Sequence, residues 1–175
     1  MPRLIANALL FQLGWFACVL GGNSLWLLVV GVALAVHLLW TSSWQAEGKL
    51  LLSVFLFGSA VDSFLMHLGV FDFGEPGTLI PLWLALLWLL LGTTLNHCLA
   101  WSAQPWWRAS LLGAVGGPMA YYAGAQLGGV VLPLGTVPTL GLLAVIWAIV
   151  LPVLHGFARL YRSQYEQARR RQPQS

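Results

Sequence analysis

The sequence predicts an all-α polytopic membrane bundle of six transmembrane helices, with both termini in the cytoplasm. Of the 175 residues, 59% are hydrophobic and only 7% are charged, whereas a soluble domain carries about 25% charged residues. Six apolar runs approach the ~20 residues that a spanning helix needs. All eight Lys and Arg residues lie between the runs or at their ends. Alternating the runs across a bilayer places all of these cations on one side.

The positions of the cations set the predicted topology. The predicted helices are Leu4–Gly21, Leu25–Trp40, Leu50–Val70, Leu79–Trp101, Trp107–Gly128 and Thr139–Leu160. The cations are Arg3, Lys49, Arg108, Arg159, Arg162, Arg169, Arg170 and Arg171. Short cytoplasmic loops carry the excess of Lys and Arg, so this side is the cytoplasm, and we expect a multi-pass membrane protein.

Two domains are expected from this pattern, a six-helix transmembrane domain over residues 1–160 and a basic cytoplasmic tail over residues 161–175. The tail is expected to extend the sixth helix briefly and to contact anionic lipid headgroups rather than nucleic acid. The first run also resembles a cleavable signal peptide. Its poor cleavage site and the polar residues Asn7 and Gln12 favour a retained helix.

Asp62 is the only carboxylate inside a predicted helix. It lies about a dozen residues after Leu50, roughly 18 Å from the inner boundary and near the midplane of the bilayer. A charge there costs at least ~2.5 kcal/mol, so Asp62 must be paired, hydrated or protonated. We interpret it as a group that handles protons or anchors a ligand. A structural hydrogen bond between helices is the alternative.

The fourth predicted helix carries a second polar group, because Thr93, Asn96 and His97 share one face at helical spacing. We interpret this face as the second wall of a polar pocket that also includes Asp62. Gln12 on the first helix lies in the same half of the membrane and is a further member of the network.

The fifth predicted helix contains small residues at intervals of four, and such stripes let helices approach closely in lipid. Gly113, Gly117 and Gly124 belong to this stripe and are candidates for self-association. The stretch Gly116–Gly117–Pro118 is expected to interrupt the helix. Tyr121 and Tyr122 follow at about the depth of Asp62, so one of them can pair with it.

Three histidines, His37, His97 and His155, lie near the inner ends of the inward-running helices. Equal depth allows a metal ion or haem between them. No two of them have ligand spacing on one helix, so we favour a hydrogen-bonding role and predict no metal site; the identity of any cofactor is left open.

The sequence also resembles an uncharacterised family of small bacterial inner-membrane proteins that is catalogued as a domain of unknown function. The resemblance spans nearly the whole chain and is carried by FQLGWFACVLG (Phe11–Gly21), DSFLMHLGVF (Asp62–Phe71), PLWLALLWLLLGTTLNHCLAW (Pro81–Trp101) and GAVGGPMAYYAGAQLG (Gly113–Gly128). Genes of that family often lie near those for cyclopropane-fatty-acid-synthase-like methyltransferases. The resemblance therefore implies envelope lipid chemistry, with membrane lipids or a lipid-modifying enzyme as partners.

Three functional hypotheses follow, and the sequence contains no recognised catalytic motif that chooses among them. The first is an enzyme, or enzyme subunit, acting on a lipid or isoprenoid chain. Its catalytic residues would be Asp62, His97 and Asn96, and its substrate-binding residues Gln12, Thr93, Tyr121 and Tyr122. The second is a non-catalytic partner or scaffold of a lipid-modifying enzyme. The third is a small proton-coupled carrier.

Overall fold

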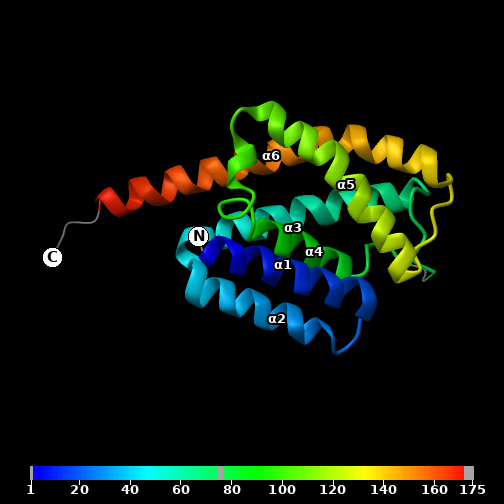
Figure 1. Cartoon of the computed structure of the whole chain (residues 1–175), viewed down its shortest axis with the longest axis horizontal. Coiled ribbons are helices and arrows are strands. Elements are labelled where there is room, and N and C mark those ends of the chain that lie inside the picture. The colour runs from blue at the N-terminus through cyan, green and yellow to red at the C-terminus, as the bar shows by residue number, and fades with distance from the viewer. Residues whose placement is uncertain (1, 75–76, 172–175) are drawn as a thin grey trace.

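The computed structural model describes residues 2–74 and 77–171, and most of them are helical (Figure 1). The α-helices are α1 (Pro2–Gly21), α2 (Leu27–Val36), α3 (Trp44–His67), α4 (Leu82–Gly92), α5 (Trp106–Gly128) and α6 (Thr136–Arg171). A π-helix, η1 (His37–Thr41), continues α2, and a 3₁₀-helix, η2 (Ala100–Ala103), precedes α5. The predicted all-α class is confirmed.

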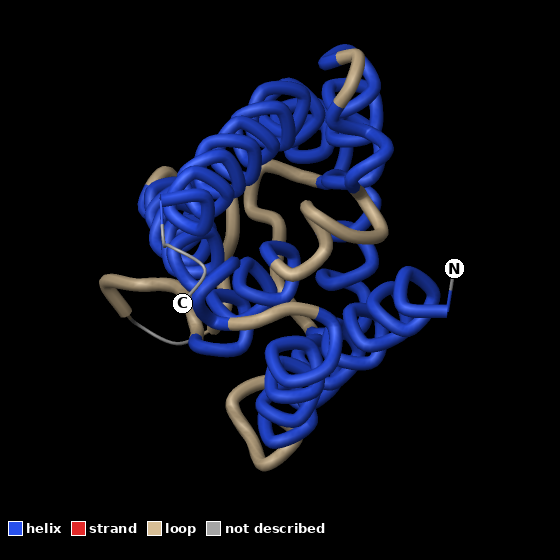
Figure 2. The backbone as a smooth tube through the Cα atoms, turned by 90° about the vertical axis from the view of Figure 1, so that its left-hand side faces the viewer, coloured by secondary structure: helices blue, strands red, loops and turns tan. Residues whose placement is uncertain are grey.

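The helices pack in pairs that follow the order of the chain, with α1 against α2, α3 against α4, and α5 against α6. Contacts of α3 with α6 and of α1 with α4 and α5 join the pairs. The α3–α4 pair lies between the other two in Figure 1, and Figure 2 looks along the helices from the end at which α1 begins. This arrangement places α1, α4, α5 and α6 around a shared interior.

Three helices, α1, α3 and α6, are long and apolar enough to cross a membrane. The apolar segments Leu27–Thr41 and Leu82–Gly92 are shorter. The outward side of α1 carries a row of exposed large apolar side chains: Leu4, Ile5, Leu9, Leu13, Phe16 and Leu20. An apolar surface of this extent suits contact with lipid rather than with water.

The fourth helix ends at Gly92, nine residues before the predicted end at Trp101. The predicted end is wrong because a side chain from α1 takes over backbone groups that a longer helix would use. Asn7 Nδ2 donates to the carbonyl oxygen of Thr93 at 3.0 Å, and Asn7 Oδ1 accepts from the backbone N–H of Cys98 at 3.3 Å. The chain between α4 and η2 therefore turns instead of continuing as a helix.

The third helix begins at Trp44 rather than at the predicted Leu50. Ser43 caps it, since its hydroxyl oxygen accepts from the backbone N–H of Ala46 at 3.3 Å. A serine at this position satisfies one of the free N–H groups of a helix start. The earlier start brings Glu47 inside the helix and buries it.

The fifth and sixth helices also differ from expectation. The predicted interruption at Gly116–Gly117–Pro118 is wrong, because α5 continues through Pro118 to Gly128. A proline removes one helical hydrogen bond, and extensive packing against α6 retains the helix around it. The sixth helix continues through the basic tail to Arg171 instead of ending soon after Leu160.

Two glycines of the α5 stripe pack against α6 of the same chain. A methyl group added at Gly113 would collide with the backbone carbonyl of Trp147, and one added at Gly117 would collide with the Trp147 indole ring. These two glycines therefore let α5 approach α6 closely. Gly124, in contrast, has no atom within 4 Å of an added methyl group, although it is buried.

Candidate functional site

Asp62 is fully buried on α3 and accepts hydrogen bonds from two other helices. The indole Nε1–H of Trp88 on α4 donates to Asp62 Oδ2 at 2.7 Å. The hydroxyl of Tyr121 on α5 donates to Asp62 Oδ1 at 2.6 Å. Of the two tyrosines that the sequence offered as partners, Tyr121 is the one that pairs. Both oxygens of the carboxyl group thus have a donor, as a buried polar group requires.

A stack of aromatic rings surrounds the two donors. Trp88 lies parallel to Trp147 of α6, with ring centroids 5.1 Å apart and an interplanar angle of 7°. Tyr121 stacks on Phe71 with centroids 5.2 Å apart. The hydrogen bonds to Asp62 fix the polar edges of Trp88 and Tyr121, while the stacked neighbours fix their faces. The carboxyl group therefore determines how these rings are oriented.

Gly58 makes this arrangement sterically feasible. It lies one helical turn before Asp62 on α3, and an added methyl group would overlap the indole ring of Trp88. Without a side chain at this position, the indole can lie against the α3 backbone and reach Asp62. A glycine inside a helix costs about 1 kcal/mol relative to alanine, and here it permits the contact between α3 and α4.

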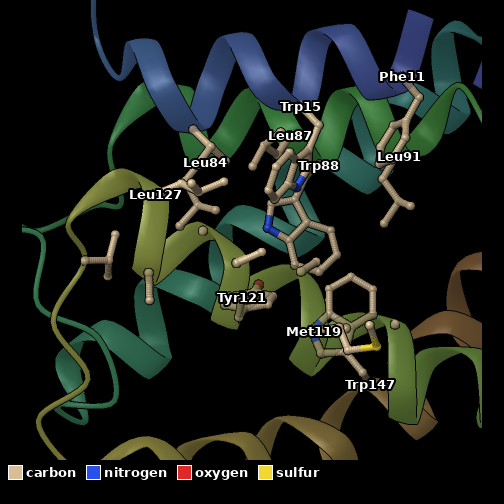
Figure 3. Close-up of a pocket in the computed structure, with 18 of the residues that line it drawn as sticks. Phe11, Trp15, Leu84, Leu87, Trp88, Leu91, Met119, Tyr121, Leu127 and Trp147 are labelled. Atoms are coloured by element: carbon tan, nitrogen blue, oxygen red, sulfur yellow. The ribbon is translucent and has the colours of Figure 1, made fainter. Parts of the chain in front are cut away.

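An apolar cavity of about 580 Å³ lies next to these rings, between α1, α4, α5 and α6 (Figure 3). The residues labelled in Figure 3 that line it are Phe11, Trp15, Leu84, Leu87, Trp88, Leu91, Met119, Tyr121, Leu127 and Trp147. Gly113, Gly116, Gly117 and Gly124 form part of the α5 wall. The α5 wall thus combines large side chains, such as Met119 and Tyr121, with glycines that leave space open toward α1 and α4.

The candidate residues divide into those that line the cavity and those that do not. Gln12 and Tyr121 are on its wall. Asp62 lies behind the wall and touches the cavity only through Trp88 and Tyr121. Tyr122 is 44% exposed and does not line the cavity. Thr93 is buried elsewhere, with its hydroxyl donating to the carbonyl oxygen of Leu90 at 2.6 Å.

A second buried polar cluster centres on Glu47, which is 4% exposed. The Nε2 atom of His37 lies 2.7 Å from Glu47 Oε2, and the Nε2 atom of His97 lies 2.9 Å from Glu47 Oε1. Asn96 Nδ2 donates to Glu47 Oε1 at 3.1 Å. These contacts join η1, α3 and the turn between α4 and η2.

The two clusters are far apart, so the predicted single pocket is replaced by two sites. Glu47 and Asp62 are 15 residues apart on α3, which corresponds to about 22 Å along the helix axis. Asn96 and His97 contact Glu47 and do not contact Asp62. Their predicted helical face is also incorrect, because α4 has already ended at Gly92.

The fold brings two of the three histidines together and places the third elsewhere. The rings of His37 and His97 lie edge to face, with centroids 5.1 Å apart. His155 belongs to a different contact, in which its Nε2 atom lies 2.9 Å from the hydroxyl of Ser102. The fold therefore does not place all three histidines around one ion.

Sequence reasoning missed Glu47 and Trp88. Glu47 lies outside the predicted helices because the apolar run begins only at Leu50, although Ser43 is a good helix-capping residue and indicates an earlier start. Trp88 is one of ten tryptophans, and nothing in its sequence context marks it as the partner of Asp62. Gly58 is the nearest available signal, since a glycine within an apolar helix often marks close packing.

The hydrogen bonds of Asp62 predict different outcomes for two substitutions. Asp62→Leu leaves the Trp88 N–H and the Tyr121 hydroxyl without an acceptor. Each unsatisfied group costs about 1–3 kcal/mol, so the free energy of unfolding should fall by about 2–6 kcal/mol. Asp62→Asn should cost less, because its oxygen still accepts from Trp88 and the tyrosine hydroxyl can reverse its role and accept from the amide. Denaturant unfolding in detergent micelles, followed by tryptophan fluorescence, measures both, and equal losses would contradict this assignment.

The comparison with protein families covers most of the chain. The profile of a family described as "Protein of unknown function (DUF2878)" matches residues 4–153. No curated protein and no solved structure matches the chain. The matched range contains Glu47, Asp62 and His97 and ends within α6, before its basic part. Because the match spans more than half of the sequence, the predicted resemblance to an uncharacterised family is confirmed, and this chain belongs to the DUF2878 family.

Proposed function

We propose that this protein binds the apolar chain of a lipid or isoprenoid within the membrane and serves in envelope lipid modification. The observation that carries the proposal is the apolar cavity of about 580 Å³ between α1, α4, α5 and α6. Binding cavities for small molecules are usually about 300–1,000 Å³ and mostly apolar, with a few placed polar groups. The size and the lining of this cavity suit a single acyl or isoprenyl chain.

The location of the cavity favours a membrane lipid over a water-soluble ligand. Two of its walls, α1 and α6, are helices long and apolar enough to cross a membrane. An acyl or isoprenyl chain that enters from the bilayer moves from one apolar environment to another. Its binding therefore depends on shape and packing rather than on the hydrophobic effect. The aromatic side chains of Phe11 and Trp15 on α1 and Trp147 on α6 line the cavity and provide such a packing surface.

Within this proposal, Tyr121 and Gln12 supply polar groups to the wall of the cavity. Asp62 is a positioning residue, because it acts through the hydroxyl of Tyr121 and the indole of Trp88. The hydrogen bonds hold both rings in fixed orientations before a ligand enters. A wall that is already ordered reduces the entropy lost when the ligand binds.

We further propose that the chain crosses the bacterial inner membrane six times, with both termini in the cytoplasm. The start of α1 and the last turns of α6 lie at the same end of the bundle (Figure 1). Lys49 near the start of α3 and Arg108 near the start of α5 carry positive charge to that end. The segments Leu27–Thr41 and Leu82–Gly92 are short for spans, and local thinning of the bilayer accommodates short spans at modest cost.

Lipids that co-purify with the protein test the binding proposal. Gly124 lines the cavity and has open space around it, so Gly124→Leu should fill the cavity without a backbone collision. Gly141→Leu is the matched control, since Gly141 is an exposed glycine of α6 with nothing within 4 Å. Mass spectrometry should find a specific lipid or isoprenoid with the wild type and the control, and should find it lost from Gly124→Leu. The same bulk phospholipid in all three preparations would refute chain binding in this cavity.

Reporter fusions test the topology. Green fluorescent protein fused after Arg171 should fluoresce, and alkaline phosphatase at the same position should be inactive, because both results require a cytoplasmic end. Alkaline phosphatase fused within the 129–135 loop, between α5 and α6, should be active. Active phosphatase at the end of α6 would show that the proposed orientation is wrong.

A further inference from the structure

We propose that His37, Glu47 and His97 form a binding site for a divalent transition-metal ion such as Zn²⁺. One ligand atom from each residue lies within 4.8 Å of the others. Two imidazoles and one carboxylate are a common ligand set for zinc sites that leave a fourth position open for water or substrate. This site is separate from the lipid cavity, and its existence does not depend on the function proposed for that cavity.

The local backbone is irregular at two of the three ligands. The α-helical pattern of α2 changes to a π-helix at His37, where the backbone N–H of Ser42 donates to the carbonyl oxygen of His37 at 2.8 Å. Single turns of π-helix occur frequently at functional sites. His97 lies in the turn that follows the early end of α4. Both departures from a regular helix bring a histidine to Glu47.

Charge provides a second argument. Glu47 is almost completely buried, and among residues 2–74 and 77–171 no Lys or Arg lies within salt-bridge distance of it. Its contacts are with His37, His97 and Asn96. Buried carboxylates are normally paired with a cation or coordinate a metal. A divalent ion between Glu47 and the two imidazoles supplies the positive charge that no Lys or Arg provides here.

The geometry needs only a small adjustment to hold the ion. Zinc–ligand bonds of about 2.0–2.2 Å place the ligand atoms of a tetrahedral site roughly 3.3–3.5 Å apart. The present contacts of 2.7 and 2.9 Å are made by the histidine Nε2 atoms to different oxygens of Glu47, and each must widen by less than about 1 Å. The widest separation among the three ligand atoms is at most 4.8 Å, so it must narrow by no more than about 1.5 Å. The side chain of His97 is 18% exposed, which gives an ion a path into the cluster.

The side-chain amide of Asn7 lies beside the second ring nitrogen of His37. This amide is oriented by the carbonyl of Thr93 and the backbone N–H of Cys98, so that Nδ2 points toward His37 Nδ1 at 3.4 Å. In the tautomer whose Nδ1 accepts this hydrogen bond, Nε2 carries the ring proton and donates to Glu47. Metal binding at Nε2 moves the ring proton to Nδ1, where it faces the Asn7 amide N–H. Asn7 therefore favours the metal-free arrangement and lowers the affinity of the site.

This role of Asn7 gives the proposal a distinctive test. In metal sites the second nitrogen of a ligating histidine donates to a carboxylate or carbonyl, and losing that partner typically costs 10–100-fold in affinity. Asn7→Asp places an acceptor beside His37 Nδ1 but loses the hydrogen bond to the Thr93 carbonyl. It is therefore compared with Asn7→Ala, which loses that hydrogen bond without adding an acceptor, and we expect zinc to bind about tenfold more tightly to Asn7→Asp than to Asn7→Ala. A purely structural hydrogen-bond network would show no such gain.

The experiment is a titration of the full chain in detergent micelles with Zn²⁺ in competition with a chromophoric chelator, after purification without a metal-affinity tag. The wild type should bind one zinc ion per chain and should unfold at a higher temperature with zinc than without it. Glu47→Gln and His97→Ala remove a ligand, so they should lower the affinity at least about 100-fold. His155→Ala removes a buried histidine outside the cluster and should bind zinc like the wild type.

Because His97 is partly exposed, a loss of zinc binding by His97→Ala can be distinguished from misfolding. His97→Ala removes one of the three side-chain partners of Glu47, so without metal it should unfold at a modestly lower temperature than the wild type. It should also lose the increase that zinc produces. A wild type that binds no zinc, or zinc bound equally well by wild type, Glu47→Gln and His97→Ala, would overturn the proposal. Both outcomes leave the lipid test at Gly124 unaffected.

Discussion

The centre of this fold is organised by the need to satisfy one carboxyl group in an apolar interior. Asp62 is fully buried, and the donors that reach it come from α4 and α5. Because unpaired polar groups are costly where water is absent, these bonds restrict how the three helices can pack. Trp88 extends the restriction to α6 through its stack with Trp147. One side chain on α3 thus influences the relative placement of four helices.

The cavity follows from the same constraint together with the glycines of α5. Gly113 and Gly117 bring α5 close to Trp147, while Gly124 leaves its surroundings open. Trp88 and Tyr121 are held by Asp62 and do not turn to fill the space. The result is a preformed apolar volume inside the bundle. The Glu47 cluster stabilises the opposite part of α3, where it joins η1 and the turn after α4. The proposed lipid-binding and metal-binding sites therefore lie in different regions of one helical frame.

Local patterns in the sequence were sufficient to predict the all-α class and the need of Asp62 for a partner, and they offered two tyrosines of the fifth helix, of which Tyr121 is the partner. They failed where a long-range contact overrides a local preference. The apolar run through Trp101 looked helical, but Asn7 binds the backbone of residues 93 and 98 and ends α4 early. Glu47 lies outside the predicted third helix because hydropathy does not detect the polar first turn of α3. The partnership of Trp88 with Asp62 depends on helix packing across 26 residues of sequence, which periodicity alone does not reveal.

A double-mutant cycle tests the central claim, that Asp62 and Trp88 are joined by a hydrogen bond that stabilises the bundle. The free energies of unfolding would be measured for wild type, Asp62→Leu, Trp88→Phe and the double variant under one set of detergent conditions. Direct contact predicts non-additive effects, with a coupling energy of about 0.5–3 kcal/mol. A second cycle, with Tyr122→Phe in place of Trp88→Phe, serves as the reference, because exposed Tyr122 makes no hydrogen bond to Asp62. Effects of Asp62→Leu and Trp88→Phe that add to within about 0.5 kcal/mol would contradict the account.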